Sequence, residues 1–289
     1  MATLPDHFTT VSIGMPVYNS EKWIKSAIDA LLNQTYPNIE LIISDNASSD
    51  NTQDLCEALA RENPCIVYHR NKSNVGVTEN YNRVFRASSG KYFKWASGSD
   101  LLEPTFIEQC VKYLNANPDV ILVSTRTILF DGEPKNGREY EHDISADQEY
   151  PGERFLYCID SMRRNNIMNG VFLREKLALT GLCKNYIASD INMIAELSLY
   201  GKLVTLPEFA FYRRDEKQTA SSLLSSDEKL EMYKPGTESI MRLQNWRLHI
   251  ERFWAVLRSS ISISEKRKTL HRLSKKMFWA RHDLWLDIK

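Results

Sequence analysis

The sequence alternates short apolar runs with longer amphipathic segments between residues 10 and 125. This alternation constrains the fold most, because the two kinds of segment favour strands and helices in turn. Apolar runs predict strands at 10–18, 39–45, 65–70, 91–97 and 119–125, and the segments between them predict helices at 20–34, 51–62, 77–88 and 103–117. Repeated strand–helix units predict an α/β fold, with a largely parallel sheet covered by helices on both faces.

Polar side chains stand where four of these predicted strands end. They are Tyr18 and Asn19, then Asp45, then Arg70, and finally Ser97 to Asp100. Ligands of open parallel sheets bind beyond the carboxyl ends of the strands, so this edge is the predicted binding site. The chain has no G-x-G-x-x-G after the first strand, no P-loop motif and no G-x-S-x-G. These absences argue against a dinucleotide-binding domain, a P-loop protein and a serine hydrolase.

The composition, 43% hydrophobic and 26% charged over 289 residues, is that of a globular protein with a sizeable core. No apolar run approaches the roughly 20 residues of a membrane span, and residues 1–10 lack the pattern of a signal peptide. The five cysteines are scattered and form no C-x-x-C pair. We therefore expect reduced thiols, a cytoplasmic protein and no zinc site.

Four stretches of the chain, at 11–52, 74–82, 92–104 and 169–214, lie in order and at ordinary spacing. They resemble the family-2 glycosyltransferases with the GT-A fold, and the resemblance covers roughly residues 10–214. The resemblance implies a GT-A type, Rossmann-like, mostly parallel sheet flanked by helices, with a helical appendage at the C-terminus. It also implies a nucleotide-sugar half at about residues 10–100 and an acceptor half at about 101–233.

The resemblance also implies roles for particular side chains at the strand ends. The nucleotide sugar would contact Pro16, Val17, Tyr18, Asn19, Asp45, Asn74, Ser99 and Asp100. Asp100 would also bind a divalent metal, Mn²⁺ or Mg²⁺, and Asp190 matches the general base of inverting enzymes. Arg213 and Arg214 are candidates to clamp the diphosphate. Simpler roles stay open: Asp45 as a helix cap, Asp100 as a turn residue and Asp190 as a charge favoured at a helix N-terminus.

The predicted metal site departs from the family pattern in two respects. Ser99 stands where the first of two carboxylates is usual, and Gly98 replaces a further acidic position of some members. The residues after Arg214 read DEKQTASS, without the His that many relatives place there as a metal ligand. Metal binding would then depend on Asp100, with donor phosphates and water supplying most of the roughly six oxygen ligands.

The predicted function is the inverting transfer of one sugar, of hexosyl or N-acetylhexosaminyl type, from a nucleotide diphosphate sugar. We expect a UDP-sugar donor and an acceptor hydroxyl on a glycan, a lipid-linked sugar or a small molecule, in glycan, polysaccharide or glycoconjugate biosynthesis. The absence of Q-x-x-R-W favours single addition over polymer synthesis. One alternative is a nucleotidyltransferase, although that class would show a Gly-rich basic loop after the first strand. Another is a non-catalytic sugar-nucleotide-binding or scaffold protein with a degenerate metal site.

The net charge of zero hides two regions of opposite charge. Residues 1–233 carry 24 Lys and Arg against 32 Asp and Glu, whereas residues 234–289 carry 13 against 5. We expect a catalytic domain at 1–233, a break near Pro235 and Gly236, and a basic helical region at 234–289 that contains four of the six tryptophans.

The basic C-terminal region predicts two helices, at 239–261 and 265–288. One stripe of the first contains Leu243, Trp246, Ile250, Phe253, Trp254 and Leu257. Two interpretations are open: the helices pack on the catalytic domain or form a homodimer, or they contact an anionic surface on the inner face of the membrane or a lipid-linked acceptor. A basic aromatic region would also suit nucleic acid, but nothing else in the sequence supports that partner.

Overall fold

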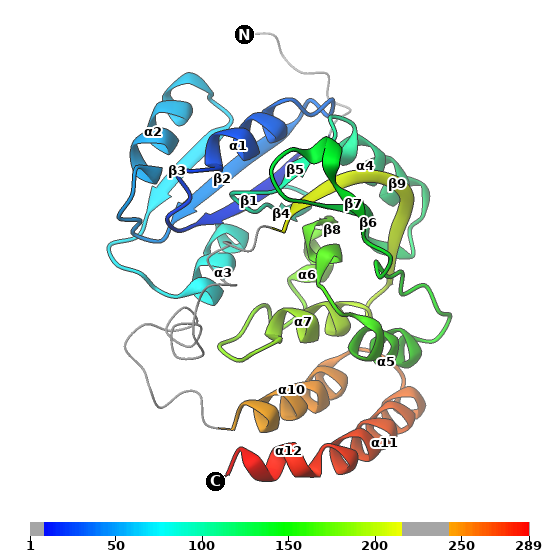
Figure 1. The fold of residues 1–289 in the computed structure, drawn as a ribbon. Coiled ribbons are helices and arrows are strands. Elements are labelled where there is room, and N and C mark those ends of the chain that lie inside the picture. Colours follow the sequence, from blue (N-terminus) through cyan, green and yellow to red (C-terminus); the bar gives the residue numbers. More distant parts are fainter. Residues whose placement is uncertain (1–8, 216–242, 289) are drawn as a thin grey trace.

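The computed structural model describes residues 9–215 and 243–288 (Figure 1). Its strands are β1 (Val11–Val17), β2 (Ile39–Asp45), β3 (Ile66–Arg70), β4 (Tyr92–Trp95), β5 (Leu101–Leu102), β6 (Val120–Phe130), β7 (Arg138–Glu139), β8 (Val171–Leu173) and β9 (Lys202–Arg214). Its α-helices are α1 (Ile24–Leu32), α2 (Thr52–Glu62), α3 (Val77–Ala87), α4 (Phe106–Ala116), α5 (Pro151–Ser161), α6 (Arg174–Leu177), α7 (Ser189–Leu197), α10 (Gln244–Arg258), α11 (Ile263–Trp279) and α12 (Arg281–Leu286). Two short 3₁₀ helices are η1 (Pro134–Asn136) and η2 (Asn166–Asn169).

The strands of the described residues form one nine-stranded sheet in the order β3-β2-β1-β4-β8-β6-β9-β5, with β7 paired to β6. The first half is parallel, since β1 runs parallel to β2 and β4, and β2 to β3. In the second half β6 and β9 are parallel, whereas β5, β7 and β8 pair antiparallel to their neighbours. The predicted α/β class is confirmed. The sequence pattern did not predict the short antiparallel strands β5, β7 and β8.

Register brings the ends of the first three strands to one edge of the sheet. Val17 lies opposite Asp45, and Asp45 lies opposite Arg70. The proline in β1 is tolerated because β4 pairs with β1 only as far as Gly14 opposite Trp95, so Pro16 lies beyond that ladder. The predicted meeting of polar strand ends is therefore present.

Helices cover both faces of the parallel half and bury the alternating residues of β1. Ile13 and Met15 pack in one core layer with side chains of α1 and α4. On the other face α3 lies close to the sheet, since a Cβ at Gly14 would stand 2.6 Å from Val84 Cγ2. Glycine at this position therefore permits the close approach of helix and strand.

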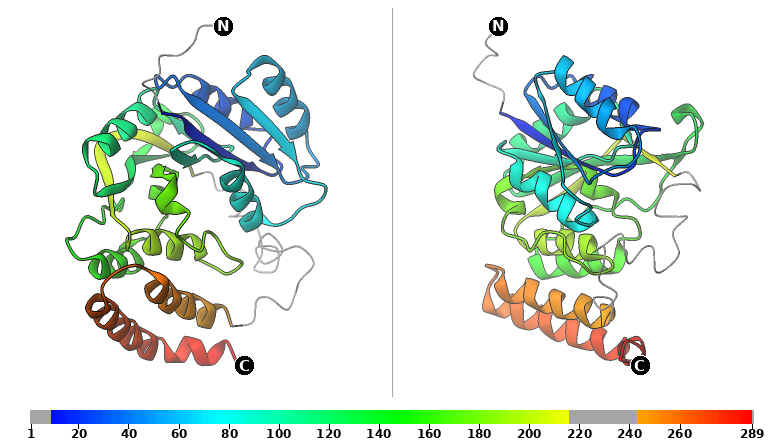
Figure 2. Two further views of the ribbon diagram at one scale, coloured as in Figure 1. Left: turned by 180° about the vertical axis from the view of Figure 1, so that it is seen from behind. Right: turned by 90° about the vertical axis from the view of Figure 1, so that its left-hand side faces the viewer.

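The C-terminal helices form the layer farthest from the parallel strands (Figure 2). α10 packs on α7, and α11 packs on α5. Ala255, Val256 and Leu273 are buried in the core shared with α5 and α7. The buried carboxylate of Glu196 accepts hydrogen bonds from the Arg258 guanidinium, which fixes α10 to α7. The predicted C-terminal helices are present in the described residues, although the one expected at 265–288 is divided into α11 and α12. The predicted break at Pro235 and Gly236 lies outside the described residues.

The inward face of α10 differs from the predicted stripe. Ile250, Trp254 and Leu257 are exposed, and the buried positions are instead His249, Ala255 and Val256. Small Ala and Val side chains let α10 approach α7 closely, whereas the large side chains of the stripe remain outside. None of the helices in the two described ranges is long and apolar enough to cross a membrane.

Lys94 is a lysine in the middle of the core. Its side chain is 1% exposed, its ammonium donates a hydrogen bond to the Asn169 carbonyl, and it lies 4.6 Å from the centroid of the Phe106 ring. Burial lowers the pKa of Lys94 to about 7. The charged form is therefore less stable in the folded protein than in the unfolded chain.

We expect Lys94→Met to stabilise the protein, and to do so more at pH 6 than at pH 10. The folded pKa lies below the unfolded value, so the penalty is fully present below about pH 7 and disappears as pH rises toward 10.5. The gain at pH 6 is on the order of a few kcal/mol, measured by urea unfolding at both pH values. Lys112→Met on the exposed face of α4 is the control. An equal gain in the free energy of unfolding at both pH values would contradict the lowered pKa of Lys94.

Candidate functional site

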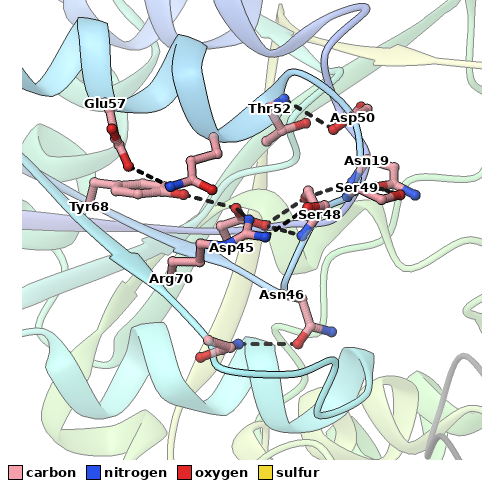
Figure 3. Close-up of polar contacts among 12 residues, drawn as sticks. Asn19, Asp45, Asn46, Ser48, Ser49, Asp50, Thr52, Glu57, Tyr68 and Arg70 are labelled. Carbon is pink, nitrogen blue, oxygen red and sulfur yellow. Dashed lines mark hydrogen bonds and ion pairs between the residues drawn. The ribbon is translucent and has the colours of Figure 1, made fainter.

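The loops that follow β1 and β2 are joined by hydrogen bonds (Figure 3). The Asn19 backbone N–H donates to Ser48 Oγ at 2.9 Å, and Asn19 Oδ1 accepts from the Ser49 N–H at 2.9 Å. The Ser20 N–H donates to Thr52 Oγ1 at 2.7 Å. Asn19 adopts a positive φ of 48°, which Asn tolerates better than most residues. The two loops therefore form one rigid rim at the carboxyl ends of the strands.

Asp45 is the fully buried anchor of this rim. Its Oδ1 accepts from the backbone N–H and the hydroxyl of Ser48, and its Oδ2 accepts from the Tyr68 hydroxyl at 2.9 Å and Arg70 Nη1 at 2.6 Å. Burial and the hydrogen bond to Asp45 raise the pKa of Tyr68. Both oxygens are thus engaged within the protein, and a direct contact of Asp45 with a nucleotide stays a prediction.

Asn74 lies in a neighbouring loop that Asn46 holds in place. Asn74 Oδ1 accepts from Asn46 Nδ2 at 2.7 Å and from the Gly76 N–H at 2.9 Å. Gly76 precedes α3 with a φ of 84°, a backbone conformation that favours glycine. The Asn46 side chain, whose Oδ1 accepts from Asn71 and the Val75 N–H, therefore links the ends of β2 and β3 to the start of α3.

The predicted donor residues of β1 differ in their exposure. Val17 is buried and Pro16 is half-buried, whereas the Tyr18 side chain is 48% exposed at the end of the strand. An exposed aromatic ring beside fixed polar groups offers a flat surface for a planar base. The structure places Tyr18, Asn19 and Asp45 on one rim.

Asp100 lies at the turn between β4 and β5. Its Oδ1 accepts from the Arg214 backbone N–H at 3.0 Å, and among the described residues no hydrogen bond reaches its Oδ2. Burial raises the pKa of Asp100, opposed by that hydrogen bond and by the charges of Arg213, Lys94 and Arg214. The Ser97 and Ser99 hydroxyls lie 3.0 Å apart beside it. One carboxylate oxygen is therefore free to meet a cation or a ligand.

The described residues contain no cluster of three His, Cys, Asp or Glu side chains able to hold a metal ion. Asp100 alone offers a carboxylate, and a Cβ at Gly98 would stand only 3.3 Å from Ser20. A side chain at position 98 would therefore press on the Ser20 side chain of the rim. The donor set matches a divalent cation only in part, with a ligand's oxygens completing its shell.

The two candidate arginines have different environments. The Arg214 guanidinium is buried, lies 3.7 Å from the Trp23 ring centroid and 4.4 Å from that of Phe130, and donates to the Ser99 carbonyl at 3.1 Å. It therefore holds the turn that carries Asp100. Arg213 is half-buried and donates from Nη1 to Asn166 Oδ1 at 2.7 Å.

Asp190 stands in the first turn of α7, where the helix dipole favours a carboxylate. Its Oδ2 accepts from Asn165 Nδ2 at 3.0 Å. Asn165 and Asn166, neighbours in sequence, therefore hold Asp190 and Arg213 respectively. Sequence reasoning missed both asparagines, because they lie at the start of a short 3₁₀ helix that has no periodic pattern.

Tyr81 of α3 has a hydroxyl that is affected by charges from several predicted site residues. Burial raises the pKa of Tyr81, and the charges of Asp100, Arg213 and Asp190 also act on its hydroxyl. The charges of three predicted site residues from separate parts of the chain thus act on one phenol. Sequence analysis did not single out Tyr81, since it is one apolar position of a helix.

The fold and this strand-end site define a class of protein. A profile of glycosyl transferase family 2 matches residues 12–173, more than half of the chain. The chain belongs to this family of glycosyltransferases, which confirms the resemblance predicted from the sequence. The nucleotidyltransferase alternative is not supported.

Curated relatives agree with this membership. The chain is 28% identical to an uncharacterized glycosyltransferase of Haemophilus influenzae, over 73% of this chain and 67% of the relative. It is 33% identical to one of Rickettsia bellii, over 48% of this chain and 20% of the relative. It is 27% identical to the minor teichoic acid biosynthesis protein GgaB of Bacillus subtilis, over 74% of this chain and 24% of the relative. The chain thus matches a quarter or less of the latter two proteins.

Solved structures share the fold. A structure of residues 1–349 of S. aureus TarS, in complex with UDP-GlcNAc, superposes with a TM-score of 0.66 at 15% identity, over 97% of this chain and 76% of that fragment. The mannosyltransferase PcManGT of Pyrobaculum calidifontis, in complex with GDP-Man and Mn²⁺, gives 0.55 at 16% identity, over 92% of this chain and 69% of that one. The likeness confirms the GT-A type fold with C-terminal helices.

We expect Asp45→Asn to lower the free energy of unfolding by about 2–4 kcal/mol, because four donors would lose a buried charged acceptor. Urea denaturation at neutral pH measures the loss. Asp54→Asn, at an exposed position in the first turn of α2, is the control and should cost no more than about 1 kcal/mol. Equal losses in the two variants would show that the buried network does not depend on the charge.

Proposed function

We propose that this protein is an inverting glycosyltransferase that moves one sugar from a nucleotide diphosphate sugar, most simply a UDP-sugar, to an acceptor hydroxyl. The observation that carries the proposal is a chain of contacts from Asp190 to Asp100. Asn165 donates to Asp190, and its neighbour Asn166 accepts from Arg213. The N–H of the adjoining Arg214 donates to Asp100. Family membership supports it, as do the structural neighbours in complex with UDP-GlcNAc and GDP-Man.

In this proposal the rim binds the nucleotide. The exposed Tyr18 ring stacks on the base, while Pro16, Val17 and Asn19 shape the backbone around it. Asp45 acts by holding Ser48 and Arg70 in place. We assign residues 10–100 to the donor half and 101–233 to the acceptor half. Asn74 closes the donor side next to α3.

Asp190 is the proposed general base. It takes the proton from the acceptor hydroxyl as that oxygen attacks the anomeric carbon and the bond to the diphosphate breaks. Asn165 donates to one carboxylate oxygen and so orients the other toward the acceptor. Attack from the side opposite the leaving group inverts the anomeric configuration.

The departing diphosphate needs positive charge. Arg213, held by Asn166, supplies it from the protein, and Arg214 keeps Ser99 and Asp100 in position. Asp100 would hold Mn²⁺ or Mg²⁺ through its unoccupied Oδ2, and such an ion would neutralise charge on the diphosphate. The five cysteines are free and four are buried, which supports a reducing, cytoplasmic compartment.

A non-catalytic sugar-nucleotide-binding protein is the second candidate, favoured by the single carboxylate of the metal site. It would bind the same donor without turning it over. Stabilisation of the folded protein by a series of nucleotide sugars identifies the donor, and release of the nucleoside diphosphate then separates enzyme from binder.

We expect Asp190→Asn to lower kcat by about two to four orders of magnitude while leaving donor affinity unchanged, because only proton removal is lost. Asn165→Ala should give a smaller loss of kcat, also without a change in donor affinity. Asp160→Asn, at an exposed position of α5, is the control. Unchanged turnover in Asp190→Asn would remove it from the mechanism.

We expect Mn²⁺ alone to bind weakly and to bind with positive coupling to the donor, each raising the affinity of the other by the same factor. Titration calorimetry with metal, donor and both measures the coupling. Ser99→Asp should tighten binding of Mn²⁺ alone, whereas Ser26→Asp on the exposed face of α1 should not. Full turnover in excess EDTA, with donor affinity indifferent to Mn²⁺, would instead assign the leaving group to Arg213.

A further inference from the structure

We propose that the outer surface of α11 and α12 attaches the protein to an anionic membrane surface. The two helices form the outermost layer of the described protein, on the side away from the parallel strands (Figure 2). Outward positions of α11 recur at three and four residues and, together with Trp285 of α12, make up the outer stripe: Lys268, Arg272, Lys275, Phe278, Trp279 and Trp285.

The aromatic part of the outer stripe is exposed to an unusual degree. Phe278 is 63% exposed, Trp279 78% and Trp285 54%. The buried positions of α11 and α12 are Thr269, Leu273 and Leu284, so these three rings lie outside the buried part of the two helices. Aromatic side chains that the fold leaves in water gain most from an interface, and Trp in particular favours the boundary between headgroups and acyl chains.

The positive charge of the C-terminal helices favours an anionic surface as the binding partner of the outer stripe. Residues 243–288 contain ten Lys and Arg against four Asp and Glu. The acidic groups are largely engaged: Glu251 pairs with Lys184, and Asp287 accepts from Asn245 and the Trp246 N–H. The exposed cation Lys275 stands about one turn before Phe278 and Trp279, and the exposed Arg272 stands about two turns before them. A second copy of this surface would bring like charges together, whereas anionic lipid complements them.

The outer stripe ends near the proposed catalytic base. The Ile187 N–H donates to Gln244 Oε1 at 3.0 Å, so α10 begins beside the start of α7, which carries Asp190. Asp287, next to α12, is bonded to Asn245 at the same end of α10. Resting on the proposed function, this placement suits an acceptor whose hydroxyl is presented at a membrane surface, such as a lipid-linked sugar.

Co-sedimentation of the full-length protein with vesicles tests the proposal. We expect binding to phosphatidylcholine vesicles that contain phosphatidylglycerol, little binding to phosphatidylcholine alone, and weaker binding at high salt. Phe278→Ser with Trp279→Ser, and separately Arg272→Glu with Lys275→Glu, should each weaken binding at least about tenfold. Val67→Ser on β3 and Lys112→Glu on α4 are matched controls at exposed positions elsewhere.

Circular dichroism and urea unfolding confirm that each variant is folded, and the two pairs of substitutions probe the surface independently. Absence of binding to anionic vesicles, or equal losses in the controls, would overturn the proposal. A concentration-dependent dimer that Phe278→Ser with Trp279→Ser dissociates would assign the stripe to a second copy instead. Asp190→Asn should bind vesicles like the parent protein, so a failed catalytic mechanism and a failed membrane surface give different results.

Discussion

The buried carboxylate of Asp45 is the interaction on which the site depends. A fully buried charge is tolerated only where hydrogen bonds and an opposite charge replace water, and here Ser48, Tyr68 and Arg70 do so together. These partners come from β3 and from the loop after β2, and Ser48 also accepts from the Asn19 N–H after β1. The compensation of one charge thus fixes three strand ends relative to one another. A ligand at this rim meets groups whose positions are set before it arrives, so little of its binding energy is lost in ordering them.

The parallel half of the fold could be predicted from the sequence because its strands and helices are long enough to show a period. β5, β7 and β8 have only two or three residues and form by pairing with distant strands. No local sequence pattern therefore predicts them. The orientation of α10 shows a second limit. The large apolar residues of α10 and its small ones lie on different faces, and the predicted stripe consisted of the large residues. Close packing on α7 selected Ala255 and Val256, which leaves Trp254 outside.

The candidate site also contains residues that the sequence predicted and residues that it did not. Parallel strands end at a common edge, so Asn19, Asp45 and Asp100 could be grouped from their places in the chain. Asn165, Asn166 and Tyr81 could not, because their contacts join parts of the chain that no motif relates. Their contribution is geometric: each holds or faces a charged group that the sequence did predict. A hydrogen-bonding neighbour of a charged side chain is recognised only once the fold has placed it.

The charge balance around Asp100 bears on the proposed mechanism, in which this single carboxylate helps to accommodate a diphosphate. Arg213, Arg214 and Lys94 all act on this carboxylate, so its surroundings already carry more positive than negative charge. A second carboxylate at position 99 would hold a cation more tightly, but it would also cancel part of that field. In the proposed mechanism, Ser99 leaves this field available to phosphate oxygens. The demand on an added cation would then fall, because Arg213, held by Asn166, and Arg214, held by Ser99 and Trp23, would supply part of the positive charge.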